Sequence, residues 1–154
     1  MLQILFLINV SNADPQMSES WRDTPELKIC FSSKVEPELV RESLIYISEN
    51  YNTGVDTNKI KITTNNFCGL PNTLEKGAIY IDNFEMIGDL YATTQTHSTT
   101  YTDKNILPSL NYAYIKFPNN LLNTDEKLFI LSHELGHALG MSHDDSDYLM
   151  RTYY

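Results

Sequence analysis

The sequence predicts an α+β domain in which helices cover one face of a β-sheet. Two observations support this: five short segments have the composition or alternation of strands, and two longer segments have helical periodicity. Their order along the chain, strand, helix, strands and helix, is typical of a layered α+β or α/β fold. The chain has 154 residues, which is enough for one domain with a substantial core.

The predicted strands are short and are separated by polar or glycine-containing turns. The last of them is the clearest, because aromatic and β-branched residues alternate until Pro118 closes the segment. The five segments are Leu27–Phe31, Ile60–Thr64, Gly77–Asp82, Asp89–Thr96 and Asn111–Phe117.

Two helices are expected, and each has start signals in the sequence. The first begins at Pro37 and ends near residues 50–54. The second is capped by Asn123 or Thr124, and Asn123 with Glu126 three residues later approximates a capping box. This helix is expected to run to about Leu139, where Gly140 can end it in a left-handed conformation.

The N-terminal residues resemble a secretory signal. Leu2–Val10 is an apolar run too short to span a bilayer, and small residues allow cleavage after Ala13. We therefore expect a signal peptide at residues 1–13, a short leader at residues 14–25, a folded domain at residues 26–154 and a secreted protein. The alternatives are a buried first strand or a signal clipped at its front.

The net charge and the cysteine content further limit the function and the compartment. Eleven basic against twenty acidic residues give a formal net charge of −9, which argues against binding to nucleic acid. Asp144, Asp145 and Asp147 form an acidic cluster that is either a calcium site or solvated surface. Cys30 and Cys68 fit one disulfide in an oxidising compartment, and the alternative is two buried free thiols.

The segment from His133 to His143 contains three of the four histidines of the chain. His133 and His137 are four residues apart on the predicted helix, so their rings can share a metal ion. Gly140 lets the backbone reverse, which allows His143 to supply a third nitrogen. Three histidines suit Zn²⁺ and leave a fourth position for water, as in catalytic zinc sites. Glu134 lies beside the metal, where its carboxylate can accept a proton from the bound water.

This segment resembles the zinc-binding signature of the metzincin clan of metalloproteases. Met150, seven residues after His143, resembles the Met-turn methionine that lies beneath the metal in that clan. Gly88–Tyr91 is similar to the start of the matrixin edge strand. The resemblance implies a minimal matrixin-like catalytic domain with a mixed, twisted sheet of about five strands, an active-site helix and a backing helix.

The same resemblance implies a zinc-dependent endopeptidase with one catalytic Zn²⁺. Its catalytic residue is Glu134, its metal ligands are the three histidines, and Gly140 and Met150 support them. A polypeptide substrate is expected to pair with the edge strand near Leu90, Tyr91 and Ala92, with Tyr154 lining the pocket after the scissile bond. We expect a monomer with no membrane span.

Some features depart from the matrixin pattern. Ala92 stands where a matrixin has a histidine of a second zinc site, and His97 alone does not make such a site. Asp144 is more similar to the adamalysin and snapalysin families. Phe67–Asn72 resembles the matrixin cysteine switch, but Cys68 follows elements that the domain needs, so a bridge to Cys30 is favoured. The alternatives to a protease are a zinc-binding module without useful proteolysis and a zinc hydrolase of small amides.

Overall fold

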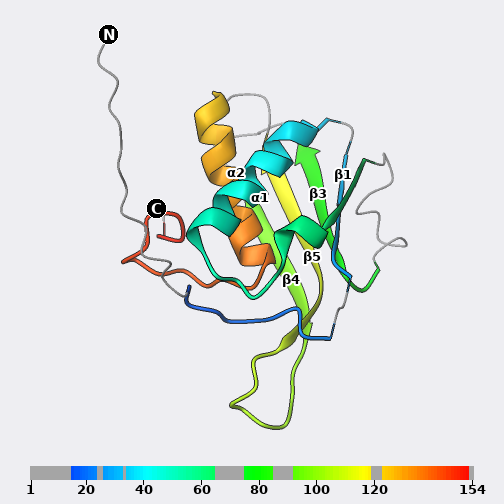
Figure 1. The fold of residues 1–154 in the computed structure, drawn as a ribbon, viewed down its shortest axis with the longest axis vertical. Helices are drawn as coiled ribbons and strands as arrows, with labels where there is room; N and C mark the ends of the chain where they lie inside the picture. The colour runs from blue at the N-terminus through cyan, green and yellow to red at the C-terminus, as the bar shows by residue number, and fades with distance from the viewer. Residues whose placement is uncertain are drawn as a thin grey trace.

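A computed structural model describes residues 15–23, 26–32, 34–64, 75–84, 92–118 and 123–152. It confirms the α+β class, because one five-stranded mixed sheet packs against two helices (Figure 1). In chain order the elements are β1 (Lys28–Phe31), α1 (Pro37–Asn50), the short 3₁₀ helix η1 (Thr57–Lys59), β2 (Lys61–Thr64), β3 (Ala78–Phe84), β4 (Thr93–Thr99), β5 (Ser109–Pro118) and α2 (Thr124–Ala138).

The strands are ordered β2-β1-β3-β5-β4 across the sheet. The first four are parallel to their neighbours, and β4 is antiparallel to β5. The antiparallel strand therefore forms one edge of the described sheet, next to the longest strand. α2 contacts both β4 and β5, so this edge lies beside the helix that carries the histidine segment.

The main core lies between the sheet and the two helices. Alternate residues of each central strand face it, as expected for strands whose side chains point to opposite faces in turn. The other face of the sheet carries a smaller cluster in which Ala78 and Tyr80 pack with Cys30, Tyr112 and Tyr114. Fully buried side chains of the main core include Ile29, Phe31, Ile79, Ile81, Ile115 and Phe117 from the sheet, and Ile47, Leu131 and Leu135 from the helices.

Both helices begin where the sequence predicts. Pro37 occupies the first turn of α1, where its missing N–H costs no hydrogen bond. Asn123 caps α2 through a complete capping box: its side chain accepts from the backbone N–H of Glu126 at 3.0 Å, and the Glu126 carboxylate accepts from the N–H of Asn123 at 3.2 Å.

The predicted fourth strand was placed too early. The strand was expected at residues 89–96, whereas β4 begins at Thr93 and ends at Thr99. Its sequence, TTQTHST, is polar on both faces, so no hydrophobic alternation marks its ends. Residues 85–91, which include Leu90 and Tyr91, lie outside the described residues.

Other sequence-based expectations concern the termini and the cysteines. The predicted signal peptide at residues 1–13 lies outside the described residues. In the part of the chain that the structure describes, no helix has the length and apolar character needed to cross a membrane. Cys30 is disulfide-bonded. The other cysteine of the chain, Cys68, is outside the described residues.

Candidate metal centre

Two histidines are placed by the regular geometry of α2. Because a helix advances 3.6 residues per turn, His133 and His137 project from the same face one turn apart. Both rings are half-buried. Their Nε2 atoms lie 3.1 Å apart, and their rings meet edge to face with centroids 4.7 Å apart.

The third histidine comes from the turn after the helix. Gly140 adopts the left-handed conformation that was predicted, with φ of +100°, and the chain then reverses. His143 is exposed, and its Nε2 lies 3.1 Å from Nε2 of His137. Three ring nitrogens thus converge on one point from two adjacent pieces of chain.

The spacing of these nitrogens suits a metal ion. Two nitrogens bound to one tetrahedral zinc at 2.0–2.1 Å lie about 3.3–3.4 Å apart, close to the spacing found here. One ligand atom from each of the three histidines lies within 4.8 Å of the others. Among the described residues, this is the one cluster of His, Cys, Asp or Glu side chains with such convergence. His133, His137 and His143 can therefore hold a metal ion.

Backbone carbonyls fix which nitrogen of each helix-borne ring faces the centre. Nδ1 of His133 donates to the carbonyl of Leu149 at 2.6 Å, and Nδ1 of His137 donates to the carbonyl of Met141 at 2.9 Å. A carbonyl oxygen can only accept, so in both rings the proton belongs on Nδ1. The two Nε2 atoms then present lone pairs to each other, an arrangement that a cation stabilises.

His137 is neutral at ordinary pH. Burial, together with the charges of His133 and His143, lowers its pKa to about 4, against an opposing effect of its hydrogen bond to Met141. A neutral imidazole is the form that binds metal, so no proton has to leave this ring before an ion can bind near pH 7.

Glu134 follows the first histidine and is held against the edge of the sheet. Its side chain is only 7% exposed. The hydroxyl of Thr94 in β4 lies 2.6 Å from its Oε2 and 3.0 Å from its backbone carbonyl oxygen. Burial raises the pKa of Glu134, while the bond from Thr94 and the charge of His143 lower it. The carboxylate is thus restrained beside the histidines rather than free in solvent.

Met150 packs under the histidine-bearing helix. Its side chain is 1% exposed, and a Cβ added at Gly136 would lie 2.7 Å from its Sδ. The absence of a side chain at Gly136 therefore lets the methionine approach α2 one residue before His137.

The loop between His143 and Met150 is braced by its own aspartates. Asp147 Oδ1 accepts from the backbone N–H of Met150 at 2.8 Å and from the hydroxyl of Tyr51, after the end of α1, at 2.9 Å. Asp144 Oδ1 accepts from the backbone and hydroxyl of Ser146. The predicted alternative of a calcium site gains no support here, because these carboxylates bond to the loop and form no converging cluster among the described residues.

Of the remaining predicted site residues, Ala92 is the one that the structure describes. Ala92 is 9% exposed and packs in the core, so it can meet a peptide only through its main chain. Leu90, Tyr91 and Tyr154 lie outside the described residues. His97 is exposed on β4, and its ring stacks on Tyr112 at 4.3 Å, on the face of the sheet away from α2.

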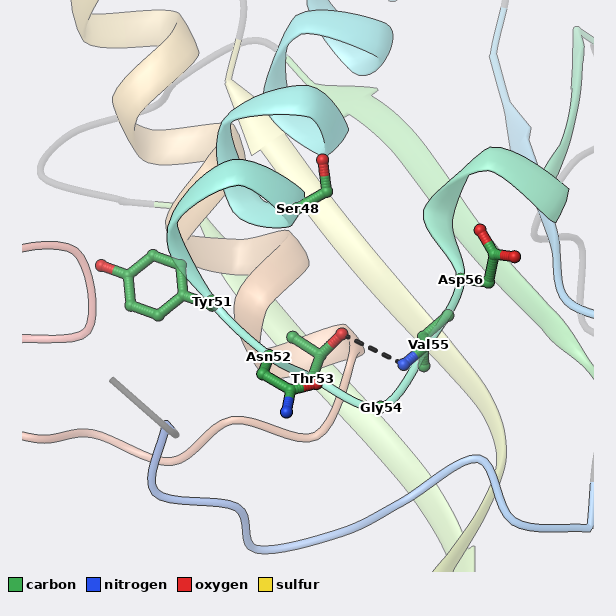
Figure 2. A pocket seen from close by; sticks show the side chains of 7 residues that line it. All are labelled: Ser48, Tyr51, Asn52, Thr53, Gly54, Val55 and Asp56. Atoms are coloured by element: carbon green, nitrogen blue, oxygen red, sulfur yellow. Dashed lines mark hydrogen bonds between the residues drawn. The ribbon is translucent and has the colours of Figure 1, made fainter. Parts of the chain in front are cut away.

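A separate hollow of about 460 Å³ lies at the end of α1 (Figure 2). It is lined by Ser48 and residues 51–56, and none of the three histidines borders it. In Figure 2 the Tyr51 side chain points away from Asp56, and its hydroxyl bonds to Asp147. Tyr51 therefore links the hollow to the loop that follows His143.

No family model matches this chain, and a search of curated proteins finds no match. The candidate centre is therefore inferred from the geometry of its own residues. Sequence reasoning missed the role of Thr94, which bonds directly to Glu134, and the roles of Tyr51 and Asp147, which brace the loop after His143. The predicted edge strand did include Thr94, but nothing in the sequence signalled which residue of α2 it would meet.

Proposed function

We propose that the chain is a secreted zinc endopeptidase of the metzincin type. The observation that carries the proposal is the convergence of three histidine nitrogens with a buried glutamate next to the first of them. His133 and His137 are held in the metal-binding tautomer by backbone carbonyls. The ring of His143 is exposed, which is compatible with the solvent access that a catalytic site requires.

Zinc bound to three histidines supplies Lewis acidity, which polarises a carbonyl and makes a water molecule more acidic. Glu134 is proposed to accept the proton of the attacking water and to return it to the leaving amine. Such proton transfer typically contributes about 10²–10⁴-fold to the rate. Thr94, by bonding to Oε2, holds the carboxylate in position and leaves its other oxygen available.

The substrate is proposed to be an extended polypeptide. β4 is the edge strand next to α2, and in the described part of the sheet its outer side has no neighbouring strand. A peptide can add to such an edge through main-chain hydrogen bonds, which places its backbone alongside Glu134. The polar side chains of β4 suit main-chain recognition, because they supply little apolar surface for selecting particular side chains.

The compartment and assembly are also proposals. The disulfide at Cys30 supports an oxidising environment, in agreement with the signal-like residues 1–13. The acidic net charge of −9 argues against nucleic acid as a partner. We propose a secreted monomer whose partner is its peptide substrate.

The test is the Glu134→Gln variant, with Glu42→Gln as the control. Glu42 is exposed on α1, so the control makes the same chemical change away from the histidines. We expect Glu134→Gln to bind one equivalent of zinc and to lose about 10²–10⁴-fold in casein or peptide cleavage, while Glu42→Gln retains both properties. Unchanged proteolysis in Glu134→Gln would refute the assigned role. Zinc binding without cleavage of any peptide in a broad library by the wild-type protein would favour a non-catalytic binding module.

A further inference from the structure

The residues before the first strand lie against the turn that carries His143. The N-terminal segment, Gln16–Trp21, runs beneath the C-terminal end of α2 in Figure 1. More than 100 residues of sequence separate the two pieces of chain. Their contact is therefore a product of the tertiary fold, and it involves none of the residues assigned to catalysis.

The contact consists mainly of main-chain hydrogen bonds. The carbonyl of Gly140 accepts from the backbone N–H of Ser18 at 2.9 Å and of Glu19 at 3.3 Å. The carbonyl of Gln16 accepts from the backbone N–H of Ser142 at 2.8 Å and from its hydroxyl at 3.0 Å. These bonds enclose an antiparallel bridge between Met17 and Met141. The N-terminal segment thus pairs with the residues directly before His143.

The far end of the segment is fixed to the core. The indole N–H of Trp21, which is 7% exposed, donates to the carbonyl of Ala138 at 2.9 Å. Ser20 makes two backbone hydrogen bonds at the start of β5. Its N–H donates to the carbonyl of Pro108, directly before the strand, at 2.9 Å, and its carbonyl accepts from the N–H of Leu110, within the strand, at 2.7 Å. The segment therefore ties the end of α2 to the longest strand of the sheet.

The turn is shaped to receive this segment. A Cβ at residue 140 would overlap the carbonyl oxygen of Glu19 and would lie 2.9 Å from its carbonyl carbon. The side chain of Met17 closes the same space, with Cε 3.2 Å from that position. Glycine at 140 is thus needed twice, once for its positive φ and once because the N-terminal segment occupies the place of a side chain.

We propose that the N-terminal segment positions His143 for metal binding. Docking of the segment fixes the backbone at residues 140–142, and that backbone presents the third Nε2 to the pair on α2. Outer contacts that orient a ligand commonly change metal affinity by about 10–100-fold. Because such coupling is reciprocal, bound zinc must in turn hold the segment more firmly against the turn.

The first test compares Ser18→Pro with Ser18→Ala in the full chain. Proline removes the 2.9 Å backbone donor, whereas alanine keeps it and removes only a 3.3 Å hydroxyl bond to the same carbonyl. Zinc affinity, measured by competition with a chelating dye, should fall about tenfold in Ser18→Pro and stay within about twofold of wild type in Ser18→Ala. Wild-type affinity in a folded Ser18→Pro variant would overturn the proposal.

The second test uses the wild-type protein, so it does not depend on whether the proline variant folds. Amide hydrogen exchange is measured in chelator and with one equivalent of zinc. The amides of Ser18 and Ser142 should exchange more slowly with zinc, whereas those of Val35 and Val40 should not change, because they lie at the start of α1, near the opposite end of α2 from the turn. Equal exchange of Ser18 in the two states would overturn the proposal. Neither test depends on peptide cleavage, so a protein that binds zinc but cleaves no peptide would refute the proposed peptidase and leave this inference standing.

Discussion

The candidate metal centre has two parts. The helix side is formed by His133, Glu134 and His137 of α2, and the turn side by residues 140–150 with His143. The rings on the helix side are half-buried, and each has a backbone carbonyl partner. The ring on the turn side is exposed. Its backbone is held by a segment more than 100 residues earlier in the chain and by the hydroxyl of Tyr51 through Asp147.

The three histidines are therefore positioned in two different ways. The spacing of the helix-side ligands follows from helical geometry and from a local capping box. The place of the turn-side ligand depends on contacts distant in sequence. We therefore expect the helix side to persist without metal, and the turn side to be where small changes alter zinc affinity.

The largest effects should come from removing one ligand on each side. His137→Ala and His143→Ala should each lose more zinc affinity than the roughly 10–100-fold typical of outer-shell changes, and peptide cleavage should fall with it. Only His137→Ala should destabilise the metal-free protein, by about 1–3 kcal/mol, because it removes the half-buried donor to the carbonyl of Met141. Thermal melts in chelator check this, and equal destabilisation by the two variants would contradict the comparison.

Alanine substitutions at two glycines distinguish the effect of backbone strain from the effect of contact with the N-terminal segment. Gly140 and Gly54 both have positive φ, of +100° and +73°, so alanine at either costs about 1–2 kcal/mol. A Cβ at Gly54 meets no atom within 4 Å, whereas one at Gly140 overlaps Glu19. Gly140→Ala should therefore be the more destabilising change and should weaken zinc binding about tenfold. If Gly54→Ala weakened zinc binding equally, general destabilisation rather than the turn would be the cause.

Thr94 in β4 bonds to Glu134 of the helix side, so Thr94→Val should lower kcat several-fold with little change in KM or zinc affinity. A hydrogen bond to a charged group contributes about 1.5–3 kcal/mol to stability. The bond from Thr94 uses part of this free energy to hold the Glu134 carboxylate in position. Thr94→Ser should restore activity, because it keeps the hydroxyl. Thr96→Val is the matched control on the same face of β4. A loss in Thr96→Val equal to that in Thr94→Val would mean that the strand, not the hydroxyl, matters.

The smallest effect is expected from Tyr51→Phe, which removes one of the two hydrogen bonds to the carboxylate of Asp147. The cost should be about 1 kcal/mol at neutral pH, with zinc affinity within a few-fold of wild type. Burial and the bond to Asp147 raise the pKa of Tyr51 above its ordinary value of 10.0. The stabilisation is thus complete below pH 10 and is lost as pH rises through the folded-state pKa. Chemical denaturation at pH 7 and pH 9 should give the same difference between Tyr51→Phe and wild type, and a difference that shrinks by pH 9 would contradict this pKa direction.

The parts of the site that the sequence predicted are those with local causes. The capping box of α2 and the positive φ of Gly140 both follow from short-range sequence patterns. The bonds of Thr94 to Glu134 and of Ser18 to Gly140 join residues 40 and 122 positions apart. Periodicity and capping rules carry no information about such pairs, and the polar sequence of β4 gave no alternation to fix its ends.

Titration of the metal-free protein with zinc, while cleavage of a fluorogenic peptide is followed, tests the central claim most directly. The account predicts that the cleavage rate rises in proportion to added zinc and stops rising at one equivalent per chain, with His143→Ala showing no such rise. Saturation of one site by zinc with no cleavage across a broad set of peptides would contradict it.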